Sequence, residues 1–168
     1  MNAWRPKFPY LFLFAAVFLI SIVVIEKYGL FDNLSDSAIA FQRPSSAMRP
    51  LSVKTDKGVF VYTVEVADNS LSREIGLMNR PFMAADRGMI FKFDAEQVEN
   101  FWMKDTYIPL DIIFMAHDGG VTRIAANAEP FSETIIPSGV PCFFVLELNG
   151  GASAKMDLKI GDKITLLP

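Results

Sequence analysis

The feature that most constrains the fold is an apolar stretch, residues 101–114, that carries charged side chains in its middle. Its sequence is FWMKDTYIPLDIIF, so Lys104 and Asp111 stand among aromatic and aliphatic residues. Burying either charge without a partner is costly, so the fold must satisfy both. Pro109 lies between them, and we expect it to bend the chain and bring Asp111 close to Lys104.

A second apolar stretch, residues 8–25, separates the N-terminus from the rest of the chain. It contains no charged residue and, as a helix with a rise of ~1.5 Å per residue, would be roughly 27 Å long, close to the thickness of a bilayer's hydrocarbon core. Arg5 and Lys7 precede it, and the charges that follow it sum to negative. The positive-inside rule therefore predicts a single span of the inner membrane, with a cytoplasmic N-terminus and an extracytoplasmic C-terminal domain.

A cleaved signal peptide is the alternative interpretation of this N-terminal segment. The small-x-small sequence at 38–40 fits a cleavage site, but it lies well beyond the apolar stretch. That stretch is also longer than the usual signal-peptide core of about 7–15 residues. We therefore expect residues 1–27 to be an uncleaved transmembrane anchor. Residues 28–50 have no periodic apolar pattern and are expected to be a flexible linker.

The remaining residues, 51–168, are predicted to form one α+β domain made mainly of antiparallel strands. Residues 58–67 alternate apolar and polar side chains, as a half-buried strand does. The His-Asp-Gly-Gly sequence at 117–120 predicts a hairpin between strands at 110–116 and 121–126. Further elements are expected as strands at 89–93, 99–103, 142–148 and 163–167, short helices at 71–79 and 152–158, and an irregular loop at 129–141. We expect a small barrel or a strongly curled sheet with one or two short helices.

The amino-acid composition limits the kinds of functional site that this chain can have. The net charge is −3 and the basic residues are scattered, so nucleic acid is not an expected partner. The chain has one cysteine, Cys142, and one histidine, His117, which excludes an internal disulfide and makes a His-rich metal site a poor candidate. We predict no cofactor. The expected partners are the membrane, through the N-terminal helix, and a small molecule or an envelope protein.

Several short motifs along the domain resemble those of the DUF192 family, also called UPF0127. In chain order they are REIGLMNR at 73–80, GMIF at 88–91, FWMKDT at 101–106, PLDI at 109–112, VLEL at 145–148 and GD at 161–162. The match covers nearly the whole domain. The resemblance implies a compact β-rich domain, often exported or membrane-anchored, with no assigned biochemical activity. It therefore supports the expected fold and location and supplies no catalytic residue.

Trp102, Lys104, Thr106 and Asp111 form the first group of candidate binding residues. On an extended strand Trp102 and Lys104 share one face, where the ring would stack on a ligand and the ammonium group would bind an anion or a hydroxyl. One alternative is a purely structural pair that fixes the barrel, in which Asp111 is held by Lys104 or by an arginine. Another is an enzyme in which Lys104 acts with Asp111 or Glu147 as acid and base.

Arg73, Met78 and Glu147 complete the candidate set. Arg73 and Arg80 both suit recognition of a ligand carboxylate. They suit pairing within the protein, with Asp111 or Glu147, equally well. Glu147 interrupts the apolar strand at 142–148, so we expect it to face water or to pair with a buried cation, either Arg73 or Lys104. The leading hypothesis is a membrane-tethered extracytoplasmic ligand-binding or interaction module of unknown biochemical function.

Clustered methionines suggest a third alternative. Five of the eight lie close together in sequence, and they are Met78, Met83, Met89, Met103 and Met115. Outside the cytoplasm, converging thioethers can hold Cu(I), and Trp102 could shield the ion. The competing interpretation is that these methionines are flexible filler of the hydrophobic core.

Overall fold

The structure is a computed structural model that describes residues 47–168. The expected transmembrane anchor, the alternative cleavage site and most of the expected linker lie outside these described residues. Within 47–168, no helix is long and apolar enough to cross a membrane.

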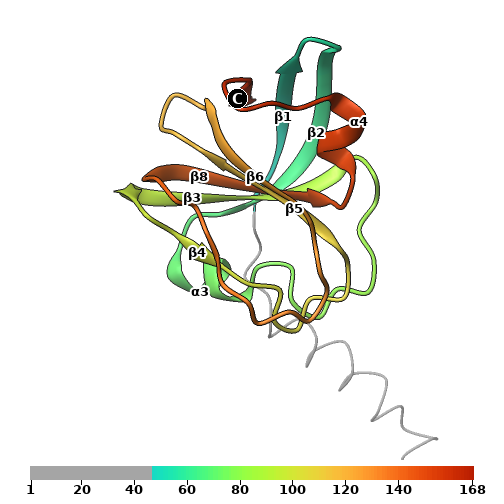
Figure 1. The fold of residues 1–168 in the computed structure, drawn as a ribbon, viewed down its shortest axis with the longest axis vertical. Coiled ribbons are helices and arrows are strands. Elements are labelled where there is room, and N and C mark those ends of the chain that lie inside the picture. Colours follow the sequence, from blue (N-terminus) through green and yellow to red (C-terminus); the bar gives the residue numbers. More distant parts are fainter. Residues whose placement is uncertain (1–46) are drawn as a thin grey trace, which may run out of the picture. The chain divides into compact units, whose positions relative to one another are not determined.

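Seven strands form one strongly curled sheet (Figure 1). Their order across the sheet is β6 (Val121–Ala128), β5 (Leu110–Met115), β8 (Cys142–Asn149), β3 (Arg87–Gln97), β2 (Gly58–Ala67), β1 (Met48–Thr55) and β9 (Lys163–Leu166). Among the strand pairs of the described residues, only β2 and β3 run parallel, because the connection between them crosses over through helix α3 (Ser70–Ile75). A small second sheet pairs β4 (Asn100–Phe101) with β7 (Ile136–Pro137), and helix α4 (Ala152–Met156) follows β8. The mainly antiparallel, curled sheet with two short helices confirms the predicted fold class of the domain.

The two edge strands of the sheet meet beside the β5–β6 turn. Gly120 forms a β-bridge with Lys163, and the Ile164 N–H donates to the Gly119 carbonyl at 3.0 Å. Gly119 has a φ of +79°, and a Cβ there would collide with the Ile164 carbonyl oxygen. This close approach therefore requires glycine, and it closes one end of the curled sheet.

Apolar side chains pack on both faces of the sheet. One cluster packs α4 against the strands, and its large members are Leu51, Val53, Val64, Ile90, Ile113, Met115, Leu146, Leu148, Met156 and Ile164. The other lies on the opposite face, beneath the segments around α3 and β4, and includes Leu77, Met83, Met89, Phe91, Phe93, Met103, Leu110, Ile112, Phe114 and Val145. Because side chains alternate along a strand, Glu147 of β8 points to the second face.

Strand β1 begins inside the segment that we expected to be a linker. It starts at Met48, and Pro50 already pairs with Thr63 of β2. The Arg49 guanidinium donates to the Leu167 carbonyl at 2.6 Å, and the Leu167 N–H donates to the Pro50 carbonyl at 2.8 Å. These contacts join residues far apart in sequence, so local composition could not reveal them.

Two elements near the pocket are shorter than predicted. Helix α3 ends at Ile75 rather than near residue 79, because Gly76 has a φ of +48° and turns the chain away. The strand expected at 99–103 is reduced to the two residues of β4, and residues after it form a turn around Asp105, whose φ is +52°. As a result, part of the pocket described below is lined by side chains from the turns that follow α3 and β4, and not from helices or strands.

Candidate functional site

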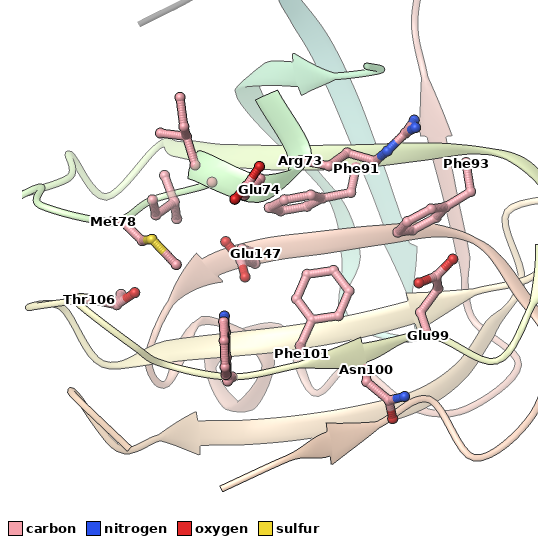
Figure 2. A pocket seen from close by; sticks show the side chains of 14 residues that line it. Arg73, Glu74, Met78, Phe91, Phe93, Glu99, Asn100, Phe101, Thr106 and Glu147 are labelled. Atoms are coloured by element: carbon pink, nitrogen blue, oxygen red, sulfur yellow. The ribbon is translucent and has the colours of Figure 1, made fainter. Parts of the chain in front are cut away.

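A pocket of about 290 Å³ lies between α3 and β4, over the second face of the sheet (Figure 2). It is lined by side chains from α3 and its following turn, from β3 and β8, and from the segment that includes β4. The lining residues are Arg73, Glu74, Ile75, Gly76, Leu77, Met78, Phe91, Phe93, Glu99, Asn100, Phe101, Trp102, Thr106 and Glu147. The pocket therefore combines an apolar, aromatic surface with several acidic groups.

The turn after α3 supplies one wall of the pocket. The helix is fixed at its start by a capping box, in which Asn69 accepts from the Ser72 N–H at 3.0 Å and the Ser72 hydroxyl oxygen accepts from the Asn69 N–H at 3.2 Å. Gly76 then reverses the chain direction, so that Leu77 is buried and Met78 lines the pocket. The position of this wall thus follows from a cap at one end of the helix and a glycine at the other.

Aromatic rings form the apolar part of the pocket. Phe101 packs edge-to-face against Phe91, with ring centroids 5.1 Å apart, and against Phe114 at 5.8 Å. Phe93 lies beneath the Arg73 guanidinium, whose carbon is 5.6 Å from the ring centroid. These interlocked rings hold the apolar surface in a fixed geometry.

Arg73 is engaged by groups other than Glu147. Its guanidinium donates to the Lys92 carbonyl at 2.8 Å and lies 3.5 Å from the Asp94 carboxylate. The expected pairing of Glu147 with Arg73 is therefore wrong. Helix α3 runs alongside β3, and the nearest acceptors for Arg73 belong to that strand.

Glu147 is the most unusual side chain in the pocket. Only 5 % of its surface is exposed, and its strand neighbours in the sheet are Met89 and Ile112. Within residues 47–168 no group donates a hydrogen bond to its carboxyl and no cation forms a salt bridge with it. Burial raises the pKa of Glu147 to about 8, and the positive charge of Arg80 opposes this effect only in part. A carboxyl that is neutral at pH 7 thus faces the pocket.

The charge of Arg80 is balanced by a different carboxylate. Arg80 holds Glu65 with two parallel contacts, and its Nη2 lies 2.5 Å from Glu65 Oε2. This pair corrects the expectation that Arg80 would hold Asp111 or Glu147. Because Glu65 is on β2, the pair ties the loop after α3 to the sheet, and Glu147 is left without a salt bridge.

Comparison with known proteins agrees with this fold. The profile of the DUF192 family (Uncharacterized ACR, COG1430) matches residues 51–166. The chain belongs to the DUF192 family. A crystal structure of a proposed transcription regulator from Sinorhizobium meliloti 1021 is 41 % identical, with a TM-score of 0.72 over 74 % of this chain and 97 % of that one. A protein of unknown function from Novosphingobium aromaticivorans DSM 12444 is 38 % identical, with a TM-score of 0.69 over 74 % and 94 %. No match was found among curated proteins.

Asp111 of the DUF192 domain has a structural environment and does not line the pocket. It is fully buried, and its Oδ1 accepts from the N–H groups of Asn127 at 2.8 Å and Gly151 at 3.0 Å. Its Oδ2 accepts from the Ser153 N–H at 2.7 Å and the Ser153 hydroxyl at 2.6 Å. The carboxylate therefore joins β5 to the end of β6 and to the first turn of α4.

Lys104 does not pair with Asp111, so that expectation is wrong. Lys104 is exposed, and its ammonium group lies 5.3 Å from the Trp102 ring centroid. The segment is a turn rather than a strand, because the Thr106 N–H donates to the Met103 carbonyl at 3.2 Å and the Thr106 hydroxyl to the Lys104 carbonyl at 3.0 Å. This turn points the Lys104 ammonium group to solvent and leaves Trp102 and Thr106 on the pocket wall.

The DUF192 pocket gathers five of the seven candidate residues: Arg73, Met78, Trp102, Thr106 and Glu147. Lys104 and Asp111 are not among its lining residues. Sequence reasoning missed Glu74 and the three phenylalanines as pocket residues. Glu74 and Phe91 lie inside the motifs that indicated the family, but nothing in the sequence alone indicated that they meet in space.

The five methionines of the Cu(I) hypothesis lie in three parts of the DUF192 domain. Met78 lines the pocket, whereas Met83, Met89 and Met103 are buried in the core on the same face of the sheet, and Met115 lies in the core on the other face. Four of the five are thus buried core side chains. This burial favours the core-filling interpretation.

Proposed function

We propose that this domain is a binding module whose ligand occupies the pocket beside Glu147. The observation that carries the proposal is a buried carboxyl that faces a cavity and has no partner among the described residues. Buried polar groups are nearly always hydrogen-bonded, so an unpartnered one at a pocket marks a place for a ligand group. A volume of about 290 Å³ suits a small molecule, with a mostly apolar lining and a few placed polar groups.

An acid–base enzyme is the second candidate, and one observation favours it. The pKa of Glu147 is raised to about 8, so the side chain holds a proton that it could donate at neutral pH. Glu74, the other carboxyl that Figure 2 places near Glu147, would act with it as the base. The enzyme hypothesis in which Lys104 and Asp111 act as acid and base is not retained, because neither side chain lines the pocket.

Ligand binding can be followed through Trp102. The chain contains two tryptophans, and Trp4→Phe in the full chain leaves Trp102, on the pocket wall, as the only one. Titration of small molecules against this variant is expected to change the Trp102 emission saturably for compounds that enter the pocket.

The same substitution at two exposed glutamates, one in the pocket and one outside it, provides a test variant and its matched control. Glu74→Phe places a ring in the pocket and should weaken binding at least about tenfold, because it fills space that the ligand needs. Glu133→Phe should leave binding unchanged. Saturable binding that survives Glu74→Phe, or no binder at all in a broad panel, would contradict the proposed function.

We further propose that the domain is tethered to the inner membrane and lies outside the cytoplasm. The uncharged stretch at 8–25 and the preceding Arg5 and Lys7 support this location. A reporter that works only outside the cytoplasm should be active when fused after Pro168, and a reporter that works only in the cytoplasm should be inactive. The reverse pattern would overturn the orientation.

A further inference from the structure

We infer that the ligand of this pocket is a small organic cation, an ammonium group on an apolar stem, whose charge is received by Glu147 and Glu74. This inference rests on the binding function proposed above and names the chemical class of its ligand. It follows from the charges that line the pocket, from the position of Glu147 and from the aromatic walls.

The charged groups of the pocket are mainly acidic. Three glutamates line it, Glu74, Glu99 and Glu147, against a single cation, Arg73. Arg73 is held by the Lys92 carbonyl and Asp94, and Glu99 accepts from the Gln97 amide at 2.6 Å. In the part of the chain that the structure describes, the side chains of Glu74 and Glu147 have no hydrogen-bond or ion-pair partner. These two carboxyls are therefore available to a bound cation.

The two available carboxyls occupy different depths of the same pocket. Glu74 is on α3 and is exposed, whereas Glu147 is on β8 and is almost completely buried. In Figure 2 both carboxyl groups point into the space between α3 and the sheet, with the Met78 sulfur and the Thr106 hydroxyl nearby. An ammonium group has three donors and would be received by oxygen acceptors at this place.

Glu147 gives the site its preference for positive charge. Facing it are Arg80, whose charge is balanced by Glu65, and Glu74, while its strand neighbours are apolar. A cation beside Glu147 would supply the partner that ionisation of a buried carboxyl requires. An anion would be repelled by Glu74 and Glu99, and the one lining cation, Arg73, is already engaged. A neutral ligand would leave Glu74 without a counter-charge and Glu147 protonated. Cations are therefore favoured over both.

The aromatic walls suit the rest of such a ligand. The rings of Phe91 and Phe101 provide an apolar surface for a stem, and the faces of aromatic rings attract cations. The Trp102 ring already accepts a cation, because the Lys104 ammonium group lies 5.3 Å from its centroid. Carboxyls at one end and rings along the sides make the pocket complementary to an amphipathic amine.

Three probes of nearly equal shape test the inference. They are 2-phenylethylamine, 2-phenylethanol and phenylacetate, which are a cation, a neutral molecule and an anion at pH 7. Binding to the full chain with Trp4→Phe is measured by Trp102 fluorescence and by calorimetry. We expect the amine to bind at least about tenfold more tightly than the alcohol, and phenylacetate to bind more weakly than both.

Variants assign the preference to the two carboxyls. Glu147→Gln keeps the side-chain shape and should reduce the preference for amine over alcohol to within about threefold, because the neutral amide cannot become an anion. Glu74→Gln should reduce it less, since this side chain is exposed to solvent. Glu133→Gln, an exposed change outside the pocket, should leave the preference unchanged.

A second readout is the release of a proton on binding. If the amine ionises Glu147, calorimetry in two buffers of different ionisation enthalpy should detect up to about one proton released per amine bound at pH 7, and none with Glu147→Gln. Equal binding of alcohol and amine, or a preference that survives Glu147→Gln, overturns the inference. If the alcohol binds as tightly as the amine and Glu74→Phe abolishes the binding of both, the pocket function stands while the cation inference falls. If none of the three probes binds, the cation inference falls as well.

Discussion

Asp111→Ala is expected to lower the free energy of unfolding by about 3–5 kcal/mol. The change removes the acceptor of four hydrogen bonds, from Asn127, Gly151 and twice from Ser153. A buried donor left without an acceptor costs about 1–3 kcal/mol, and partial access of water to Asn127 limits the sum. Urea denaturation followed by Trp102 fluorescence measures the effect. A loss below about 1 kcal/mol would show that Asp111 does not hold these segments together.

Lys104 provides the control for this prediction. Lys104→Met changes an exposed side chain with no salt bridge among the described residues, so stability should change by less than about 0.5 kcal/mol. The double variant with Asp111→Ala should show a coupling energy within about 0.5 kcal/mol of zero. A coupling above about 1 kcal/mol would restore the direct pairing of the two residues that the sequence suggested.

The sequence predicted best where local chemistry decides the structure. The β5–β6 hairpin follows from the His-Asp-Gly-Gly turn, and the strand expected at 58–67 has the bounds of β2, Gly58–Ala67. The apolar residues on either side of Glu147 likewise marked it as a carboxyl in an apolar strand. These features depend on neighbours in sequence, which the chain itself displays.

Predictions from the sequence failed where contacts join segments that are distant in sequence, or where one residue changes the direction of the backbone. Glu65 is on β2, and nothing near it in sequence indicates that Arg80 holds it. The interpretation of Lys104 and Asp111 assumed an extended chain after Trp102, but Asp105 adopts a φ of +52° and a turn forms there. That turn separates the two charges and at the same time leaves Trp102 and Thr106 on the pocket wall.

Stability is expected to fall as the pH rises from about 5 to 9, and Glu147 is the reason. Its pKa is raised from 4.5 to about 8 in the folded protein, so in this range the folded chain holds a proton that the unfolded chain has released. This stabilisation is complete when the pH is below the pKa of Glu147 in the unfolded chain. It is lost as the pH rises through the pKa of Glu147 in the folded protein. The difference between the two pKa values corresponds to a loss of at most roughly 5 kcal/mol in the free energy of unfolding, at ~1.4 kcal/mol per pKa unit.

Glu147→Gln removes this titration while keeping the size of the side chain. The variant should therefore match the native protein at pH 5 and exceed it by several kcal/mol at pH 9, because a neutral amide never has to carry a buried charge. Glu74→Gln, a change of the exposed carboxyl in the same pocket, should keep the native loss of stability. Urea denaturation at pH 5, 7 and 9 measures all three proteins. A native protein as stable at pH 9 as at pH 5 would mean that Glu147 is solvated or paired when ionised, and the pocket would then lack the unpartnered carboxyl on which a cationic ligand depends.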